Sequence, residues 1–284
     1  MGALLGPKGG LIEVGCSSTL DVEAEPRHEF EVTLGGRRLA YVAPVSRRSW
    51  SVTVGTATPD EASNLGQILS ESFAQQVSRG PFWWLDEWAQ VSNMLTPAQS
   101  MCEAGVWSSG NQSGPAAWGA DFDGFRPLAT MSHTAPAAST LLSPVPGVSV
   151  VAPAGRPFTV SVYGAPWTAA GANPGTLRVV EVAHDGAMVR THTSKPTSGP
   201  AAGQRLVVQG VTLAATVGLR VEVRDLMTWA APQVTLTPDI PAWAEGAGAH
   251  SVVADRTGIG VQMATPDATW GRRAGFSFAV HEVG

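Results

Sequence analysis

Alternating hydrophobic and polar positions predict β-strands in the first part of the chain. Residues 28–34 alternate in this way, and Gly35 and Gly36 follow them directly. Two glycines are typical of a two-residue hairpin, because a type I′ turn needs positive φ at both central positions. Residues 48–56 alternate again, with hydroxyl residues on one face. The other face of this expected half-buried strand carries Trp50, Val52 and Val54.

One helix is predicted over residues 59–79. Thr58 is a good N-cap, and Glu61 completes a capping box with it. Gly80 and Pro81 would end the helix. Its hydrophobic residues form one stripe at helical spacing, which we expect to pack on the hairpin: Leu65, Ile68, Leu69, Phe73 and Val77.

After an aromatic stretch at residues 81–88, which we expect to be a strand, the pattern changes. From Asn93 on, the chain is rich in Gly, Pro, Ala and Thr, and residues 238–249 have the composition of a linker. Asp185 and Gly186 mark a further hairpin turn. Strands with turn residues between them favour a β-sandwich or jelly roll over a parallel-sheet enzyme. They are predicted at residues 158–163, 177–182, 188–193, 206–211, 219–225 and 233–237.

These patterns predict a mainly β chain of two domains. Residues 1–92 would form a small β-sandwich or α+β domain with one helix, and residues 93–239 a jelly-roll β-sandwich. The alternating residues 276–284 match residues 11–15 in pattern. We therefore expect the two ends to share one sheet, so that residues 240–284 complete the first domain. A simple succession of two domains is the alternative.

Composition narrows the class of protein. Of 284 residues, 44% are hydrophobic and only 14% are charged, below the ~25% of average domains. So low a charged fraction is typical of a β-rich protein packed against other subunits. It is equally compatible with a neutral extracellular β protein. The net charge of −5 gives no basic stripe for a nucleic-acid partner. Without a signal peptide or a run of ~18 apolar residues, we expect synthesis in the cytoplasm and no membrane partner.

Motifs for catalysis and metal binding are weak or absent. The sequence lacks G-x-S-x-G, H-E-x-x-H and a P-loop, so no catalytic residue is assigned and no enzyme is expected. Asp86 and Glu87 would point to opposite faces of a strand and form no catalytic pair. Residues 121–124 resemble part of a calcium loop, although a turn with solvated carboxylates is favoured. We expect no metal or cofactor, with a structural calcium as the alternative, and reduced, buried thiols at Cys16 and Cys102.

Tryptophan is unusually frequent, with ten residues against two of tyrosine. An exposed tryptophan can stack on a sugar ring or anchor a protein interface. In the β-rich part the candidates for glycan binding, with partly buried loop anchors as the alternative, are Trp107, Trp118, Trp167 and Trp229. Trp167 is the strongest of them, since Pro166 and the turn at residues 171–175 would hold it outward. In the first domain the candidates for an oligomer interface are Trp50, Trp83, Trp84 and Trp88.

Several segments resemble a known family. Residues 47–52, 80–85 and 89–97 are similar to distal tail and minor tail proteins of long-tailed, siphovirus-like phages, especially those of actinobacterial hosts. The β-rich part resembles the galactose-binding-like, carbohydrate-binding jelly rolls of such proteins. In that resemblance, residues 93–100 correspond to the entry of the module and residues 157–163 to a core strand.

The resemblance implies a structural virion protein at the tail tip. Such proteins form a ring, usually a hexamer, between the tail tube and the baseplate hub, and a ring is a closed heterologous assembly. The jelly rolls would point outward, where several copies could bind host cell-wall glycan with gain from multivalency. A further hypothesis is that the jelly roll binds no sugar and only separates neighbouring subunits.

A different class of protein is the alternative, namely a cell-surface glycan-binding protein or a glycoside hydrolase. A hydrolase needs two carboxylates ~5–9.5 Å apart. The candidate acids are Asp121, Asp123, Glu181, Asp185, Glu222 and Asp225.

Overall fold

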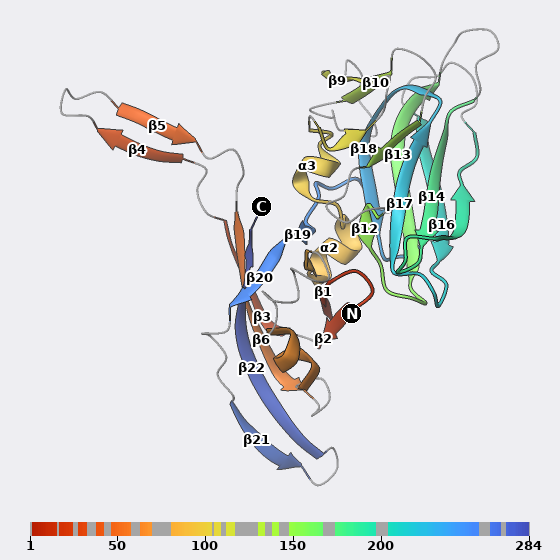
Figure 1. Ribbon diagram of the computed structural model, residues 1–284. Helices are drawn as coiled ribbons and strands as arrows, with labels where there is room; N and C mark the ends of the chain where they lie inside the picture. Colours follow the sequence, from red (N-terminus) through yellow and green to blue (C-terminus); the bar gives the residue numbers. More distant parts are fainter. Residues whose placement is uncertain are drawn as a thin grey trace. The chain divides into compact units, whose positions relative to one another are not determined.

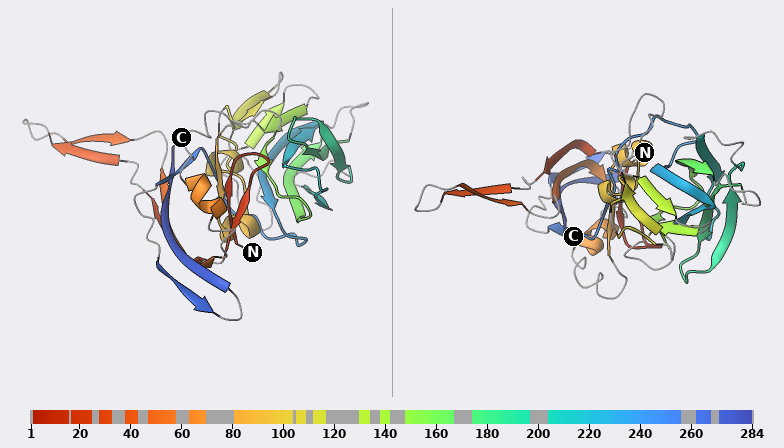
Figure 2. Two further views of the ribbon diagram at one scale, coloured as in Figure 1. Left: turned by 60° about the horizontal axis from the view of Figure 1, so that its bottom comes forward. Right: turned by 90° about the horizontal axis from the view of Figure 1, so that it is seen from above.

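The computed structural model describes residues 2–15, 17–24, 28–32, 38–42, 47–57, 63–69, 81–103, 105–108, 112–116, 130–133, 138–141, 148–166, 174–196, 204–255, 262–267 and 271–283. The expected mainly β class is confirmed (Figures 1 and 2). The chain forms two compact units. Unit 1 contains Met1–Gly6, Ile12–Trp84 and His250–Gly284, and unit 2 contains Pro7–Leu11 and Leu85–Ala249.

Unit 1 is built mainly from β-strands. The first sheet has the order β20 (Val252–Asp255), β22 (Gly271–Glu282), β6 (Arg48–Ala57) and β3 (Ser17–Ala24), and β21 (Gln262–Asp267) also pairs with β22. A second has the order β19 (Ala249–His250), β7 (Trp83–Leu85), β1 (Ala3–Gly6) and β2 (Ile12–Val14). The expected hairpin strands are β4 (His28–Val32) and β5 (Arg38–Val42), which pair antiparallel. Its turn glycines, Gly35 and Gly36, lie outside the described residues.

The C-terminal strand β22 lies beside β6, at the centre of the first sheet. Arg48 and Glu282 form an ion pair at 3.0 Å across the two strands, and Ser49 Oγ lies 2.9 Å from His281 Nδ1. The expected partner of the C-terminal strand, residues 11–15, was wrong, because β2 pairs with β1 in the second sheet. Alternation specifies which face of a strand is buried, but not which strand lies beside it.

The predicted pattern of β6 and of the helix agrees with the burial of their side chains. Trp50, Val52 and Val54 are at most 2% exposed. Residues 63–69 are helical, and the stripe residues among them, Leu65, Ile68 and Leu69, are buried. The rest of the predicted helix, including Phe73 and Val77, lies outside the described residues.

Unit 2 is a β-sandwich of two antiparallel sheets (Figure 1). The five-stranded sheet has the order β16 (Gln204–Val211), β13 (Pro157–Pro166), β18 (Leu226–Thr235), β10 (Thr130–His133) and β9 (Gln112–Ala116). The six-stranded sheet has the order β15 (Met188–Thr193), β14 (Thr176–Val182), β17 (Gly218–Arg224), β11 (Ala138–Leu141) and β8 (Trp107–Ser108), with β12 (Val150–Val151) paired to β17.

The core of unit 2 follows from alternation along these strands. Leu177 and Val179 on β14 lie opposite Val223 and Val221 on β17, and all four are fully buried. The predicted turn between β14 and β15 is present: Gly186 has φ +88°, and the Asp185 carboxylate accepts a hydrogen bond from the Ala187 N–H. Strand β18 begins at Leu226, earlier than the predicted residue 233.

The aromatic stretch contains only a short strand, β7, and the expected strand over residues 81–88 was wrong beyond Leu85. Helix α2 (Glu87–Ser92) follows, with Asp86 as its N-cap. The Asp86 carboxylate accepts a hydrogen bond from the Ala89 N–H at 2.6 Å, which satisfies one of the donors at the helix start. Asp86 is therefore a buried cap rather than an exposed strand residue.

The segment predicted as a linker is instead attached to unit 2 through Asn93. The buried Asn93 side chain donates to the carbonyls of Pro232 and Ala244, and its backbone carbonyl accepts from the Ala247 N–H. Its side-chain oxygen also accepts from the Val234 N–H. Helix α3 (Pro97–Ser100) follows, with a capping box of Thr96 and Gln99. Gly246 and Gly248 lie close against the backbone of residues 94–96, because a Cβ at either position would clash with backbone carbonyls.

Candidate functional site

The tryptophans predicted to bind glycan are not at the surface where they are described. Trp107 and Trp229 are 4% and 0% exposed, and their rings meet edge to face with centroids 4.3 Å apart. A ring packed inside the sandwich cannot stack on a sugar, so their expected exposure was wrong. Trp118 and Trp167 lie outside the described residues.

Three of the four predicted interface tryptophans are core residues of unit 1. Trp50, Trp83 and Trp84 are at most 1% exposed, and the rings of Trp50 and Trp84 lie 6.3 Å apart. Their expected place at an interface was wrong, because the unit's own core buries them. Trp88 differs, since it lies in unit 2, outside the domain in which it was predicted, and its residue is 66% exposed. Val91, one helical turn later on α2, is 40% exposed.

Two of the candidate acids lie on adjacent strands of the six-stranded sheet but on opposite faces. Glu181 lies opposite Leu219, whose side chain is in the core, whereas Glu222 lies opposite Arg178 on the outer face. Side chains on opposite faces of one sheet cannot act together on one bond. Asp121 and Asp123 lie outside the described residues.

Glu181 is the buried centre of a polar network. Its Oε1 accepts from Arg190 at 2.5 Å and lies 2.7 Å from His192 Nε2. Its Oε2 accepts from Thr216 Oγ1 at 2.5 Å and from the Leu213 N–H at 2.8 Å. Burial alone would raise the pKa of Glu181, but hydrogen bonds from His192, Thr216, Leu213 and Arg190 outweigh it and lower the pKa to about 2. The carboxylate is ionised, fully paired and 0% exposed, which is a structural arrangement.

Glu222 on the outer face is surrounded by three guanidinium groups. Arg220 Nε donates to its Oε1 at 3.0 Å, and Arg224 Nη2 donates to its Oε2 at 3.0 Å. Arg178, directly opposite Glu222 on β14, places Nη1 3.4 Å from Oε2. We call these four residues the arginine cluster. One carboxylate for three guanidinium groups leaves an excess of positive charge at this place.

In the arginine cluster the carboxylate is nearly buried, whereas the guanidinium groups are partly exposed to solvent. The Glu222 side chain is 7% exposed, while those of Arg178, Arg220 and Arg224 are 23%, 29% and 42% exposed. On the neighbouring strand β15, Thr191 and Thr193 are exposed. Guanidinium groups and hydroxyls in such an arrangement can donate hydrogen bonds to an anionic or hydroxyl-bearing ligand.

Sequence reasoning listed Glu222 as a candidate acid but missed the arginines. The signal was present, because Arg220, Glu222 and Arg224 are separated by one residue each and so share a face of any strand. Arg178 could not be found in this way. Its place opposite Glu222 depends on the pairing of β14 with β17.

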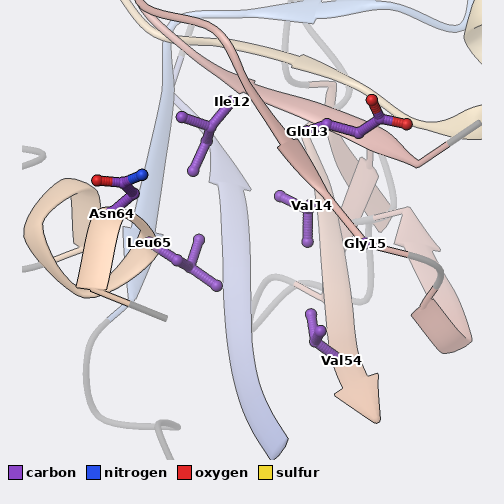
Figure 3. A pocket seen from close by; sticks show the side chains of 7 residues that line it. All are labelled: Ile12, Glu13, Val14, Gly15, Val54, Asn64 and Leu65. Atoms are coloured by element: carbon purple, nitrogen blue, oxygen red, sulfur yellow. The ribbon is translucent and has the colours of Figure 1, made fainter. Parts of the chain in front are cut away.

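Unit 1 contains a pocket of about 270 Å³ between β2, β6 and the helix at residues 63–69 (Figure 3). It is lined by Ile12, Glu13, Val14, Gly15, Val54, Asn64 and Leu65. Most of its side chains are apolar, and the Glu13 carboxylate accepts from the Gly2 N–H at 2.8 Å.

Metal binding, thiols and membrane-spanning helices can be assessed only for the described residues. Within the described ranges, no group of three or more His, Cys, Asp or Glu residues could hold a metal ion. Residues 121–124, the expected calcium fragment, and Cys16 are not among those ranges. Cys102 is a buried thiol, and burial raises its pKa to about 12. No described helix has the length and hydropathy needed to cross a bilayer.

Comparison with known proteins gives structural likeness only. No protein-family model and no curated protein matches the chain. The tailspike protein 4 enzymatically active domain of bacteriophage CBA120 is similar over 52% of this chain and 21% of that one, at 10% identity and a TM-score of 0.36. The Clostridium thermocellum xylanase 10B, as its CBM22-1–GH10 modules with xylohexaose, is similar over 54% and 30%, at 11% identity and a TM-score of 0.34.

A structure of carbohydrate-binding modules from the β-sandwich superfamily is similar over 82% of this chain and 91% of that one, at 9% identity and a TM-score of 0.29. The chain spans less than a third of the tailspike and xylanase structures. Its structural neighbours thus include a phage tailspike domain and carbohydrate-binding modules with a β-sandwich fold, at low identity. At TM-scores below 0.5, these likenesses give no basis for assigning an activity.

Proposed function

We propose that the chain is a structural virion protein of the phage tail tip, a distal or minor tail protein that forms a homo-oligomeric ring, in the family's usual case a hexamer. Its partners are copies of itself, the tail tube and the baseplate hub proteins. Its β-sandwich faces outward and contacts host cell-wall glycan. The protein acts by binding and not by catalysis.

The observation that carries the proposal is the exposed side chain of Trp88 on α2. Trp88 is 66% exposed, and Val91 lies on the same helical face. The helix beneath them is held in place, since Asp86 caps its start and the Gln90 side chain donates to the Leu85 carbonyl at 3.1 Å. A large aromatic side chain on a fixed helix is the kind of residue that dominates protein interfaces.

The order of the units along the chain also supports an assembly protein. The main segment of unit 2, Leu85–Ala249, lies in the sequence between two parts of unit 1, Ile12–Trp84 and His250–Gly284. The chain leaves unit 1 through β7 and returns through β19, which are neighbours in one sheet. A module inserted in this way adds a binding surface while the strands of the first unit still pair around it.

The mass of the purified protein in solution tests the proposal. We expect a mass several times that of the single 29.5 kDa chain and ring-shaped particles in electron micrographs. Trp88→Ala should lower the oligomer mass, because it removes the exposed anchor. Met188→Ala is the matched control, since Met188 is also exposed, at 59%, but on β15. A protein that stays a monomer at high concentration would overturn the ring.

The second candidate is a glycan-binding protein that does not assemble. The exposed guanidinium groups and hydroxyls of the six-stranded sheet support this candidate, because they could bind glycan without any assembly into a ring. The same mass measurement separates the two candidates. A monomer that binds cell-wall glycan would support the second.

A further inference from the structure

From the arginine cluster we infer that the outer face of the six-stranded sheet binds a polysaccharide whose repeating unit carries an anionic group, a carboxylate or a phosphate. The inference rests on the proposed function, because it names the class of glycan that the β-sandwich contacts. The proposed site includes none of the tryptophans that were predicted to bind glycan.

The arginine cluster presents positive charge to solvent. Every cation in it approaches the same carboxylate, and Glu222 is nearly covered. A ligand approaching from solvent therefore meets N–H groups and not the carboxylate. Guanidinium groups bind carboxylates and phosphates with paired, charge-assisted hydrogen bonds. The whole chain carries a net charge of −5, so this excess of positive charge is a local feature.

The arginines of the cluster are held in place by hydrogen bonds. Arg224 uses both Nε and Nη2 on Glu222, at 3.2 and 3.0 Å. Arg178 is held between strands, because its Nη2 donates to Thr191 Oγ1 at 3.4 Å while its Nη1 lies near Glu222. Side chains fixed before binding lose less conformational entropy when a ligand binds. This distinguishes the cluster from a group of mobile surface arginines.

The outer face extends over several strands. Arg220 and Arg224 lie four residues apart on one strand, so their Cα atoms are about 13 Å apart. Strands β14 and β15 continue the face sideways with Arg178, Thr191 and Thr193. Cations spaced along a face that also carries exposed hydroxyls suit a polymer with charges and hydroxyls in each repeat.

Other ligands fit this face less well. The strand residues described on it include no aromatic side chain to stack on a neutral sugar ring or on a nucleic-acid base. A nucleic acid also needs a longer basic footprint than three arginines. A charged glycan needs neither an aromatic side chain for stacking nor a long basic footprint.

The test is binding of the full-length protein to defined polymers. The probes are polygalacturonate, which carries carboxylates, poly(glycerol phosphate), which carries phosphates, neutral dextran and single-stranded DNA. We expect binding to polygalacturonate or poly(glycerol phosphate) that weakens as salt rises, and no binding to dextran. Whichever of the two anionic polymers binds more tightly identifies the anionic group.

The variant that tests the site is Arg224→Gln, which removes the most exposed guanidinium of the cluster. Affinity for the anionic polymer should fall about tenfold, because a charge-assisted hydrogen bond is lost. Arg224→Lys should lie between Arg224→Gln and the unchanged protein, since it keeps the charge and loses the two-nitrogen geometry. Arg47→Gln is the matched control. It removes one positive charge from an exposed position in unit 1 and should leave affinity unchanged.

Three results would overturn the inference. They are no binding to either anionic polymer, equal binding to DNA, and full affinity in Arg224→Gln with an unchanged thermal unfolding curve. A normal oligomer mass together with any of them would leave the proposed assembly standing. A monomer that binds the anionic polymer through Arg224 would overturn the ring and keep this site.

Discussion

The two faces of the six-stranded sheet hold the same chemistry in different surroundings. Inside the sandwich, Glu181 is fully buried and bound by Arg190, His192 and Thr216. Outside, Glu222 is bound by three arginines whose guanidinium groups still reach solvent. Both oxygens of the inner carboxylate are already paired, so it has no capacity for a ligand, although the side chain of its partner Arg190 is 38% exposed. The outer carboxylate is shared by three guanidinium groups, whereas the inner one pairs with a single guanidinium, so the balance of charges and not residue type separates the structural ion pair from the binding surface.

The largest effect that sharpens this comparison is expected from Glu181→Gln. The change leaves Arg190 and His192 without their anionic partner at the edge of the core. Breaking a buried pair by removing one partner costs about 3 kcal/mol or more in the free energy of unfolding. Unfolding in urea measures it, with Glu245→Gln, at an exposed position, as the control. A loss as small as that of the control would show that the inner network adds no stability.

The second prediction concerns the dependence of the free energy of unfolding on pH. In the folded chain the pKa of Glu181 is lowered to about 2 from an ordinary 4.5. Its contribution to stability is therefore complete above about pH 4.5 and is lost as pH falls through 4.5 to about 2. The free energy of unfolding, measured across this window, should fall less steeply in Glu181→Gln than in the unchanged protein. Parallel pH curves for the two proteins would contradict the assignment.

The smallest effect is expected from Glu222→Gln. The three arginines around Glu222 are partly solvated, so they regain water when the carboxylate charge is removed. The cost in the free energy of unfolding should be about 1 kcal/mol, close to that of a surface ion pair. The same urea measurement compares it with Glu181→Gln. Equal losses for the two variants would remove the distinction between the two faces.

Strand and turn patterns were the part of the fold that the sequence predicted well. Residues 188–193 were expected as a strand and form β15, and the turn at Asp185 and Gly186 joins it to β14. These features depend on neighbouring residues, so a single sequence contains them. The predicted linker at residues 238–249 failed for the opposite reason. Its polar backbone is satisfied by Asn93 and Ser100, which lie far away along the chain.

The tryptophans show where sequence reasoning about the site ended. Ten tryptophans were correctly recognised as unusual, but their residue type does not say whether a ring lies inside or outside. Trp229 fills the sandwich core against Trp107, while Trp88 projects from a helix that had been expected to be a strand. Of the arginine cluster, Arg220, Glu222 and Arg224 could have been found from their spacing alone.

By itself, then, the sequence determined the β class, the presence of strands β13 to β18 in unit 2 and the spacing that places Arg220, Glu222 and Arg224 on one face. Such features follow from local geometry, because side chains alternate along any strand. Only the tertiary structure decided that β22 pairs with β6, that Asn93 holds a distant segment, and that Arg178 joins the arginine cluster. These depend on pairing and burial between residues far apart in the chain, and the free energy that selects such pairings belongs to the packed molecule as a whole.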